Sequence, residues 1–178
     1  MLIKILLALA VVVIAFVILV AVQPADFRIA RSITIAAPPA AVFAQVNDFH
    51  AWPEFSPWAK LDPGMKTSYA GPPAGTGAGY SWAGNPKVGE GRMTITESRP
   101  NDLIRIKLEF LKPFKATNTA EFTFRAEGSQ TAVTWSMSGV NSFMFKAVGL
   151  FMNMDNMIGG DFEKGLANLK SVTEAARK

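Results

Sequence analysis

The chain of 178 residues contains no cysteine and only one histidine, His50. Without cysteine, disulfide bonds and thiolate chemistry are excluded. The shortage of both residues also excludes metal sites built from several histidines or cysteines, which leaves carboxylate sites only. We therefore expect neither a bound metal nor a cofactor.

Clusters of basic residues are absent as well. The formal net charge is +4, and the basic residues lie singly, with Arg105 and Lys107 the nearest approach to a cluster. A nucleic-acid-binding face usually gathers such residues, so no nucleic acid partner is expected. The glycine- and proline-rich segment 71–77 lacks the lysine and the following helix of a phosphate-binding loop, which argues against nucleotide binding.

Charge is also missing from residues 5–22, which are eighteen consecutive apolar residues without glycine or proline. As a helix they would span about 27 Å, close to the hydrocarbon core of a bilayer. The alternative is a cleaved signal peptide, whose apolar region usually has only about 7–15 residues. We expect residues 1–23 to form a single-pass membrane anchor, with the bilayer as a partner, and residues 24–178 to form one domain. The basic residues flanking the anchor balance, so they assign the domain to neither side of the membrane.

Short turns separate seven segments in which apolar and polar residues alternate. Alternation is typical of strands with one buried face, and hairpin-length connections indicate antiparallel pairing. A helix is expected from Pro38-Pro39 to Asn47, because proline suits the first turn. Arg31 falls on the apolar face of the first strand, and we expect it to reach solvent. The expected strands are 27–35, 65–69, 79–83, 91–97, 103–111, 115–125 and 131–138.

The alternation also predicts which side chains face inward. None of these side chains is charged, and only Tyr80 and Asn118 carry hydrogen-bonding groups suited to a reaction. An apolar face of this width needs a cover. The predicted inward positions are Tyr80, Trp82, Met93, Ile95, Ile104, Ile106, Leu108, Phe110, Asn118, Ala120, Phe122, Phe124, Val133, Trp135 and Met137.

The segment from Phe143 to Arg177 supplies that cover. It contains no proline, and its apolar residues recur at spacings of three and four, which predicts one long helix of about 50 Å. Gly159-Gly160 lies near its middle and could bend it. The methionine-rich part, residues 144–157, has more apolar surface than one helix face can bury. It either lines an adaptable cavity or touches the bilayer or a partner, and we interpret it as the gate or membrane-facing lip of a pocket.

Residues 48–58 contain Trp52, Phe55 and Trp58 together with two prolines. The segment is either a loop packed on the edge of the core or the rim of a ligand pocket, since pockets favour aromatic walls. The sequence leaves both interpretations open.

Several of these segments carry a further signal, in particular 33–38 running into Val42-Phe43, the aromatic segment 48–58, 77–82, 89–97 and 161–170. In this order they resemble the START-like, helix-grip superfamily, and more narrowly its polyketide cyclase/dehydrase and lipid-transport (SRPBCC) group. The resemblance covers roughly residues 27–172. It implies an α+β fold in which a curved antiparallel sheet of about seven strands wraps around the long C-terminal helix. It also implies a cavity between sheet and helix for an apolar small molecule.

We therefore predict a membrane-anchored domain that binds a lipid or quinone-like molecule in that cavity. A binding role needs only apolar walls and one or two polar groups, and Tyr80 and Asn118 could orient a polar head group. No catalytic residue is predicted. The predicted ligand-binding residues are Trp52, Phe55, Trp58, Tyr80, Trp82, Phe110, Asn118, Phe122, Trp135 and Met154.

Two alternatives remain open. A cyclase- or dehydrase-type enzyme would need an acid or a base within the cavity. Its candidates are His50, which has no orienting carboxylate assigned to it, and Asp161 near the inward face of the helix. In a non-catalytic interaction module, the same inward residues would close a solid core.

Overall fold

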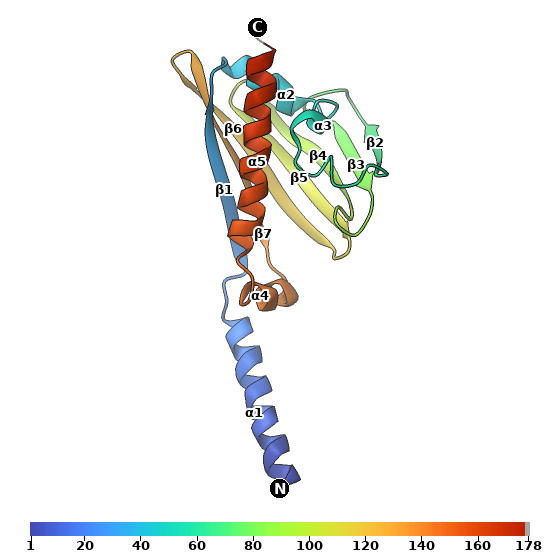
Figure 1. The fold of residues 1–178 in the computed structure, drawn as a ribbon, viewed down its shortest axis with the longest axis vertical. Coiled ribbons are helices and arrows are strands. Elements are labelled where there is room, and N and C mark those ends of the chain that lie inside the picture. The colour runs from blue at the N-terminus through green and yellow to red at the C-terminus, as the bar shows by residue number, and fades with distance from the viewer. Residues whose placement is uncertain (177–178) are drawn as a thin grey trace.

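In the computed structural model, which describes residues 1–176, seven strands form one antiparallel sheet (Figure 1). The order across the sheet is β1-β7-β6-β5-β4-β3-β2, so the strands from β2 to β7 form a meander and β1 pairs with β7. This arrangement confirms the predicted α+β class, and the predicted strand ends are correct to within a residue or two. The strands are β1 (Asp26–Ile35), β2 (Lys66–Ala70), β3 (Gly79–Ala83), β4 (Glu90–Arg99), β5 (Leu103–Lys112), β6 (Ala116–Glu127) and β7 (Gln130–Val140).

Helices lie on one face of this sheet and at its two ends (Figure 1). The helix α5 packs on one face of the sheet, mainly along β1, while α2 and α3 lie near the end of the sheet that is farthest from α1. The helix α4 lies at the opposite end, beside α1, which projects away from the domain. The helices are α1 (Leu2–Ala21), α2 (Pro39–Asn47), α3 (Trp52–Phe55), α4 (Phe143–Gly149) and α5 (Met154–Ala175).

The predicted long C-terminal helix is present as α5, but its predicted start at Phe143 is wrong, because residues 143–149 form the separate helix α4 and the chain breaks at residues 150–153. Each helix has its own N-cap. The Ser142 side chain accepts a hydrogen bond from the Phe145 amide, and the Asn153 side chain accepts one from the Asn156 amide. Such caps accept hydrogen bonds from amides that have no partner within the helix, and they stabilise the beginning of each helix. The predicted end at Arg177 lies outside the described residues.

The glycine pair in α5 does not interrupt the helix, which runs through both residues. Gly159 instead makes room for Arg31, since a Cβ atom at this position would lie 2.1 Å from Nη2 of that arginine. Arg31 donates to Asp155 at 2.9 Å and to Glu163 at 2.8 Å, and its hydrogen bond lowers the pKa of Asp155. The side chain of Arg31 is 23% exposed, so it reaches solvent in part, as expected, and it also binds two carboxylates of α5. The inner face of β1 meets α5 there, and two helix carboxylates neutralise the guanidinium.

The inner face of the sheet is apolar, as predicted. Most of the inward positions are buried in one core cluster, and Tyr80, Trp82 and Leu108 are half-buried against it. The outer face carries charge instead, in ion pairs between neighbouring strands. Glu109 on β5 contacts Arg92 on β4 at 2.7 Å and Lys107 at 3.0 Å. The hydrogen bond from Arg92, followed by that from Lys107, lowers the pKa of Glu109 to about 2.

We predict a pH-dependent effect of Glu109→Gln on stability. Because folding lowers the pKa of Glu109 from an ordinary value of 4.5 to about 2, its stabilising effect is present above pH 4.5 and is lost as the pH falls toward 2. The variant should melt at a lower temperature than the original chain at pH 7, and the difference should shrink between these two pH values. Thermal unfolding of the full chain, followed by circular dichroism, measures this.

The control is Glu54→Gln, which removes the same charge from an exposed carboxylate that has no ion pair among the described residues. This variant should leave the melting temperature at pH 7 nearly unchanged. A Glu109→Gln effect that is absent at pH 7, or that is constant down to pH 2, would contradict the prediction.

The two glycines of α5 give a second prediction. A Cβ atom at Gly160 meets open space, so Gly160→Ala should stabilise the protein by about 1 kcal/mol through helix propensity. Gly159→Ala should instead fall below the original chain in stability, because the new Cβ displaces the Arg31 guanidinium from its carboxylates. Denaturant unfolding of both variants provides the comparison. Equal stabilisation by the two substitutions would show that the contact with Arg31 is unimportant.

Candidate functional site

A cavity of about 510 Å³ lies between the sheet and the beginning of α5, at the end of the domain nearest α1. Strands β1, β5, β6 and β7 form one wall, and α4 and α5 form the other. Its position between sheet and helix agrees with the predicted architecture. The apolar lining consists of Phe27, Ile29, Phe110, Pro113, Phe114, Ala116, Met137, Val140, Phe145, Met154 and Ile158.

The cavity ends where the aromatic core begins. The Trp135 ring stacks on Phe162 of α5 with 4.3 Å between centroids, and on Phe122 at 4.7 Å. Gly165 permits this approach, since a Cβ atom there would lie 2.6 Å from the Trp135 ring. These rings fill the space between α5 and the middle of the sheet. The cavity therefore lies on the α1 side of these rings.

One polar side chain, Asn118, lies at the inner end of the cavity. The next inward residue on β6, Ala120, is buried and does not line the cavity. Asn118 is 9% exposed, and its Nδ2 contacts the Met137 sulfur at 3.7 Å. Because a thioether is a weak acceptor, the amide keeps most of its hydrogen-bonding capacity. Gly139 makes room for it, since a Cβ atom there would lie 2.2 Å from the Asn118 Oδ1.

The three charged residues that line the cavity are engaged with other parts of the protein. Arg28 donates to the Ser136 hydroxyl at 3.3 Å, and Lys112 pairs with Glu90 at 2.6 Å. Asp155 pairs with Arg31, as described above. The cavity therefore offers apolar surface and two side-chain amides, those of Asn118 and Asn141.

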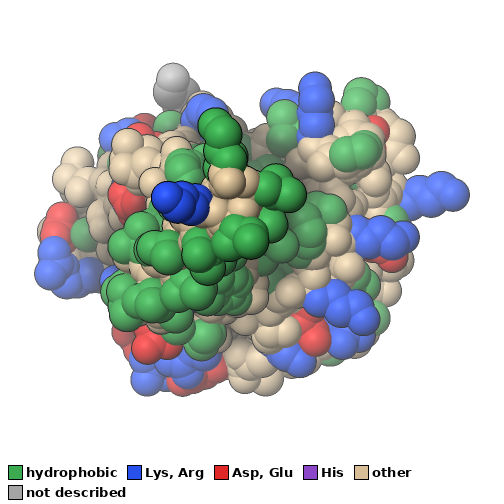
Figure 2. All heavy atoms as spheres, turned by 90° about the horizontal axis from the view of Figure 1, so that it is seen from below, with side chains coloured by type: hydrophobic (Ala, Val, Ile, Leu, Met, Phe, Trp, Pro, Cys, Tyr) green, Lys and Arg blue, Asp and Glu red, His purple; other side chains and the backbone are tan. Residues whose placement is uncertain are grey.

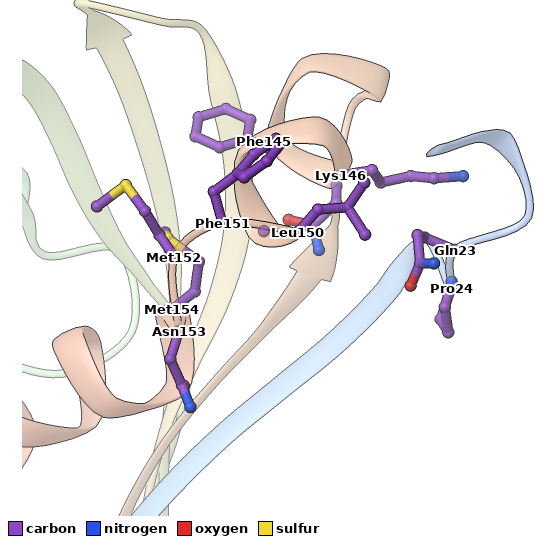
Figure 3. Close-up of a pocket in the computed structure, with 11 residues that line it drawn as sticks. Gln23, Pro24, Phe145, Lys146, Leu150, Phe151, Met152, Asn153 and Met154 are labelled. Carbon is purple, nitrogen blue, oxygen red and sulfur yellow. The ribbon is translucent and has the colours of Figure 1, made fainter. Parts of the chain in front are cut away.

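A second hollow adjoins this cavity on the side of α1. It is a cleft of about 460 Å³ between α4, the break that follows it and the residues that join α1 to β1 (Figure 3). Asn141, Phe145 and Met154 line both hollows. At the edge of the cleft, Lys146 donates to the Ala21 carbonyl at 2.8 Å. The end of α1, α4 and the cavity are thus parts of one continuous region.

Three of the predicted ligand-binding residues, Phe110, Asn118 and Met154, line the cavity. The structure does not bring the other seven to it. Contact of any of the ten with a ligand remains a prediction. Trp52, Phe55, Phe122 and Trp135 are buried in the core cluster, and Trp58, Tyr80 and Trp82 pack against that cluster.

Sequence reasoning missed several cavity residues, among them Phe27, Phe114 and Phe145. Phe114 had a usable signal, because an aromatic residue is unexpected in a hairpin turn between Lys112-Pro113 and Lys115. The Phe114 and Phe145 rings meet edge to face at 6.0 Å. Phe145 reaches the cavity only because the chain breaks after α4, and the periodicity of the sequence does not show this break.

The candidates for acid–base chemistry lie elsewhere in the fold. His50 does have an orienting carboxylate, contrary to expectation, since its Nδ1 lies 2.7 Å from the Asp48 Oδ1. This pair is half-exposed and does not line either hollow. The His50 ring stacks on Tyr69 of β2, at the other edge of the sheet from β1. Asp161 pairs with Lys164 on the surface of α5.

Tyr80, an inward residue with a hydrogen-bonding group suited to a reaction, also lines neither hollow. Burial, followed by the neighbouring Tyr69, raises the pKa of Tyr80, so this phenol is neutral at pH 7. Among residues 1–176, no group of three or more histidine, aspartate or glutamate side chains is placed to hold a metal ion.

Comparison with known proteins gives a match in sequence and a match in structure. A family model described as polyketide cyclase/dehydrase and lipid transport matches residues 26–174. No curated protein matches the chain.

Similar solved structures come from several bacteria. A protein from Chromobacterium violaceum has a TM-score of 0.59 at 15% identity, over 85% of this chain and 99% of that one. A protein from Mesorhizobium loti has a TM-score of 0.60 at 14% identity, over 84% and 98% of the two chains. A protein from Mycobacterium smegmatis has a TM-score of 0.58 at 15% identity, over 84% and 92%. At these identities the likeness shows the fold alone.

Proposed function

The chain belongs to the polyketide cyclase/dehydrase and lipid-transport family with its helix-grip fold, and we propose that it is a membrane-anchored protein that binds an apolar small molecule. The proposed ligand is a lipid or quinone-like molecule from the adjacent bilayer. The observation that carries the proposal is the position of the cavity, because its apolar walls lie at the end of the domain that meets α1.

The dimensions and chemistry of the cavity support binding. Small-molecule sites usually have volumes of about 300–1,000 Å³, with apolar walls and few polar groups. The present cavity, at about 510 Å³, falls within that range. Each methylene group moved from water into such a site gains about 0.8 kcal/mol. The flexible side chains of Met137 and Met154 would let the walls adapt to chains of different shape.

The position of Asn118 suggests how a ligand would be oriented. Its amide lies at the inner end of the cavity, and Phe114 and Phe145 lie toward α4 and the anchor. A molecule with one polar end would place that end against the amide, because an unpaired polar group in an apolar site costs about 1–3 kcal/mol. Its apolar tail would then extend toward the membrane.

The helix α1 supports the membrane part of the proposal. By length and composition it could cross a membrane, although a signal sequence near an N-terminus passes the same test. The contact between Lys146 and the Ala21 carbonyl favours a retained helix, because it joins α4 to the last turn of α1. We also propose that α1 crosses the membrane once and that the anchor ends at residue 23.

Binding is favoured over catalysis by the state of the charged residues at the cavity. Arg28, Lys112 and Asp155 each have a protein partner, and the amide of Asn118 does not titrate. A reaction would need an acid or base free to reach the substrate. Binding of a molecule in the cavity needs no such group.

We predict that Met154→Trp blocks the cavity. The larger side chain would occupy space at the boundary between the two hollows, so the occupancy of the cavity should fall about tenfold or more. The full chain would be purified in detergent and its bound molecules measured by native mass spectrometry and by lipid extraction. The control is Met157→Trp, a matched substitution three residues along α5 on an exposed residue that lines neither hollow. This variant should retain its ligand.

Two results would contradict the proposal. One is an original chain that is consistently empty and shows no shift in melting temperature across a panel of lipids and quinones. The other is equal ligand retention by Met154→Trp and Met157→Trp, which would place the bound molecule outside the cavity.

A further inference from the structure

The face of the domain that adjoins α1 exposes several large apolar side chains. Seen from the side of the anchor, hydrophobic side chains gather around and beside α1, with lysine and arginine side chains toward the edge (Figure 2). A soluble surface rarely exposes so much contiguous apolar area without a partner. We call the exposed members of this group the apolar collar: Phe114, Val140, Phe143, Met144, Phe151 and Met152.

The collar comes from three separate parts of the chain. Phe114 belongs to the turn between β5 and β6, and Val140 ends β7. The other four residues belong to α4 and to the break that follows it. Ser142 caps the beginning of α4, and Asn153 caps the beginning of α5 after the break at residues 150–153. The fold thus gathers apolar residues on one side that no described part of the domain covers.

The collar is continuous with the anchor. The Phe151 ring stacks on Phe16 of α1, with 6.4 Å between centroids. The Lys146 Nζ donates to the Ala21 carbonyl at the end of the same helix. Val20, in the last turn of α1, is fully buried, unlike the rest of that helix. These contacts fix the depth of α4 relative to α1.

That depth can be expressed as a distance along the helix. Phe16 lies five residues before the last residue of α1, which corresponds to about 7–8 Å at 1.5 Å per residue. Phe151 lies beside Phe16 and is 80% exposed, so its free surface is at the same level. Amphipathic elements in a membrane interface bury their apolar face to about 5–10 Å. If α1 spans a bilayer, Phe151 therefore lies within the leaflet.

We propose that the apolar collar is a second membrane-binding surface, inserted into the leaflet that surrounds the last turns of α1. This proposal depends on α1 spanning the membrane, which is part of the proposed function, and it does not depend on a ligand in the cavity. Lys115 follows Phe114 in the β5–β6 turn, whereas Lys112 on the other side of the turn pairs with Glu90. Lysine side chains in this position extend toward lipid head groups while the adjacent apolar residue is buried.

Insertion of the collar would place the cavity against lipid. Phe114 and Val140 belong both to the collar and to the lining of the cavity. The edge of the cavity would then face acyl chains instead of water. An apolar ligand could pass between bilayer and cavity without crossing water, which removes the main barrier to its transfer.

Single-cysteine labelling of the full chain tests this proposal, and the absence of native cysteine makes each label unique. A nitroxide spin label would be placed at Phe151→Cys and, in a second variant, at Met144→Cys. Ile18→Cys in α1 would serve as the membrane standard, and Ser129→Cys in the β6–β7 turn as the aqueous standard. The proteins would be reconstituted in nanodiscs of phosphatidylcholine and phosphatidylglycerol. Power saturation with oxygen and with a water-soluble nickel chelate then reports the depth of each label.

The proposal predicts that the labels at 151 and 144 shift toward the Ile18 value, with greater accessibility to oxygen than to nickel. If the labels at 151 and 144 gave the same depth value as the label at 129, while the label at 18 lay in the membrane, the collar proposal would be overturned. The ligand proposal would stay intact. An aqueous value at Ile18 would overturn both the anchor and the collar. Dipolar broadening between labels at position 151 in nanodiscs that hold two copies would show that the collar joins two chains, which would also overturn the proposal.

Discussion

The apolar face of the sheet has to be covered along its whole length, and α5 covers it closely only from Gly159 onward. There the Trp135 ring stacks between Phe122 and Phe162, and Gly165 lets the helix approach. Burial of these rings provides a large part of the driving force for the fold. Nearer α1, the rings of Phe27, Phe110 and Phe145 line the cavity and leave part of the space between helix and sheet open. The cavity is what remains of an apolar face whose close cover ends before the strands do.

The break between α4 and α5 determines what lies at that end. A single straight helix would have continued along the sheet and closed the cavity. The N-cap at Asn153 begins a new helix, α5. The ion pairs of Arg31 with Asp155 and Glu163 hold the first turns of this helix on β1. The preceding residues form the separate helix α4 beside α1. Because exposed ion pairs are weak individually, we attribute the position of α5 to the buried Gly159 contact and the aromatic stack together.

The sequence was sufficient to predict the fold, because alternation and short turns specify an antiparallel sheet directly. It was insufficient to locate the cavity, because alternation identifies the face of a side chain and not the depth at which it lies. Phe122 and Trp135 face inward as predicted, yet they fill the core, whereas Asn118 and Phe110 face the same way and line open space. The break after α4 was invisible to periodicity, since apolar residues continue through it. The contact between Asp48 and His50 could have been predicted from the sequence, because the two residues are only two positions apart.

The proposed function therefore depends on a cavity that is open to lipid at the end of the helix-grip domain nearest α1. Its most direct test uses nanodiscs that contain the full chain and a quinone-like lipid with a photoreactive diazirine at its polar end. After irradiation, peptide mapping by mass spectrometry locates the label. We predict label on the β6 and β7 peptides at Asn118 and Met137, the inner end of the cavity. Label confined to α1 and the apolar collar would show that lipid surrounds the domain without entering it, and would contradict the account.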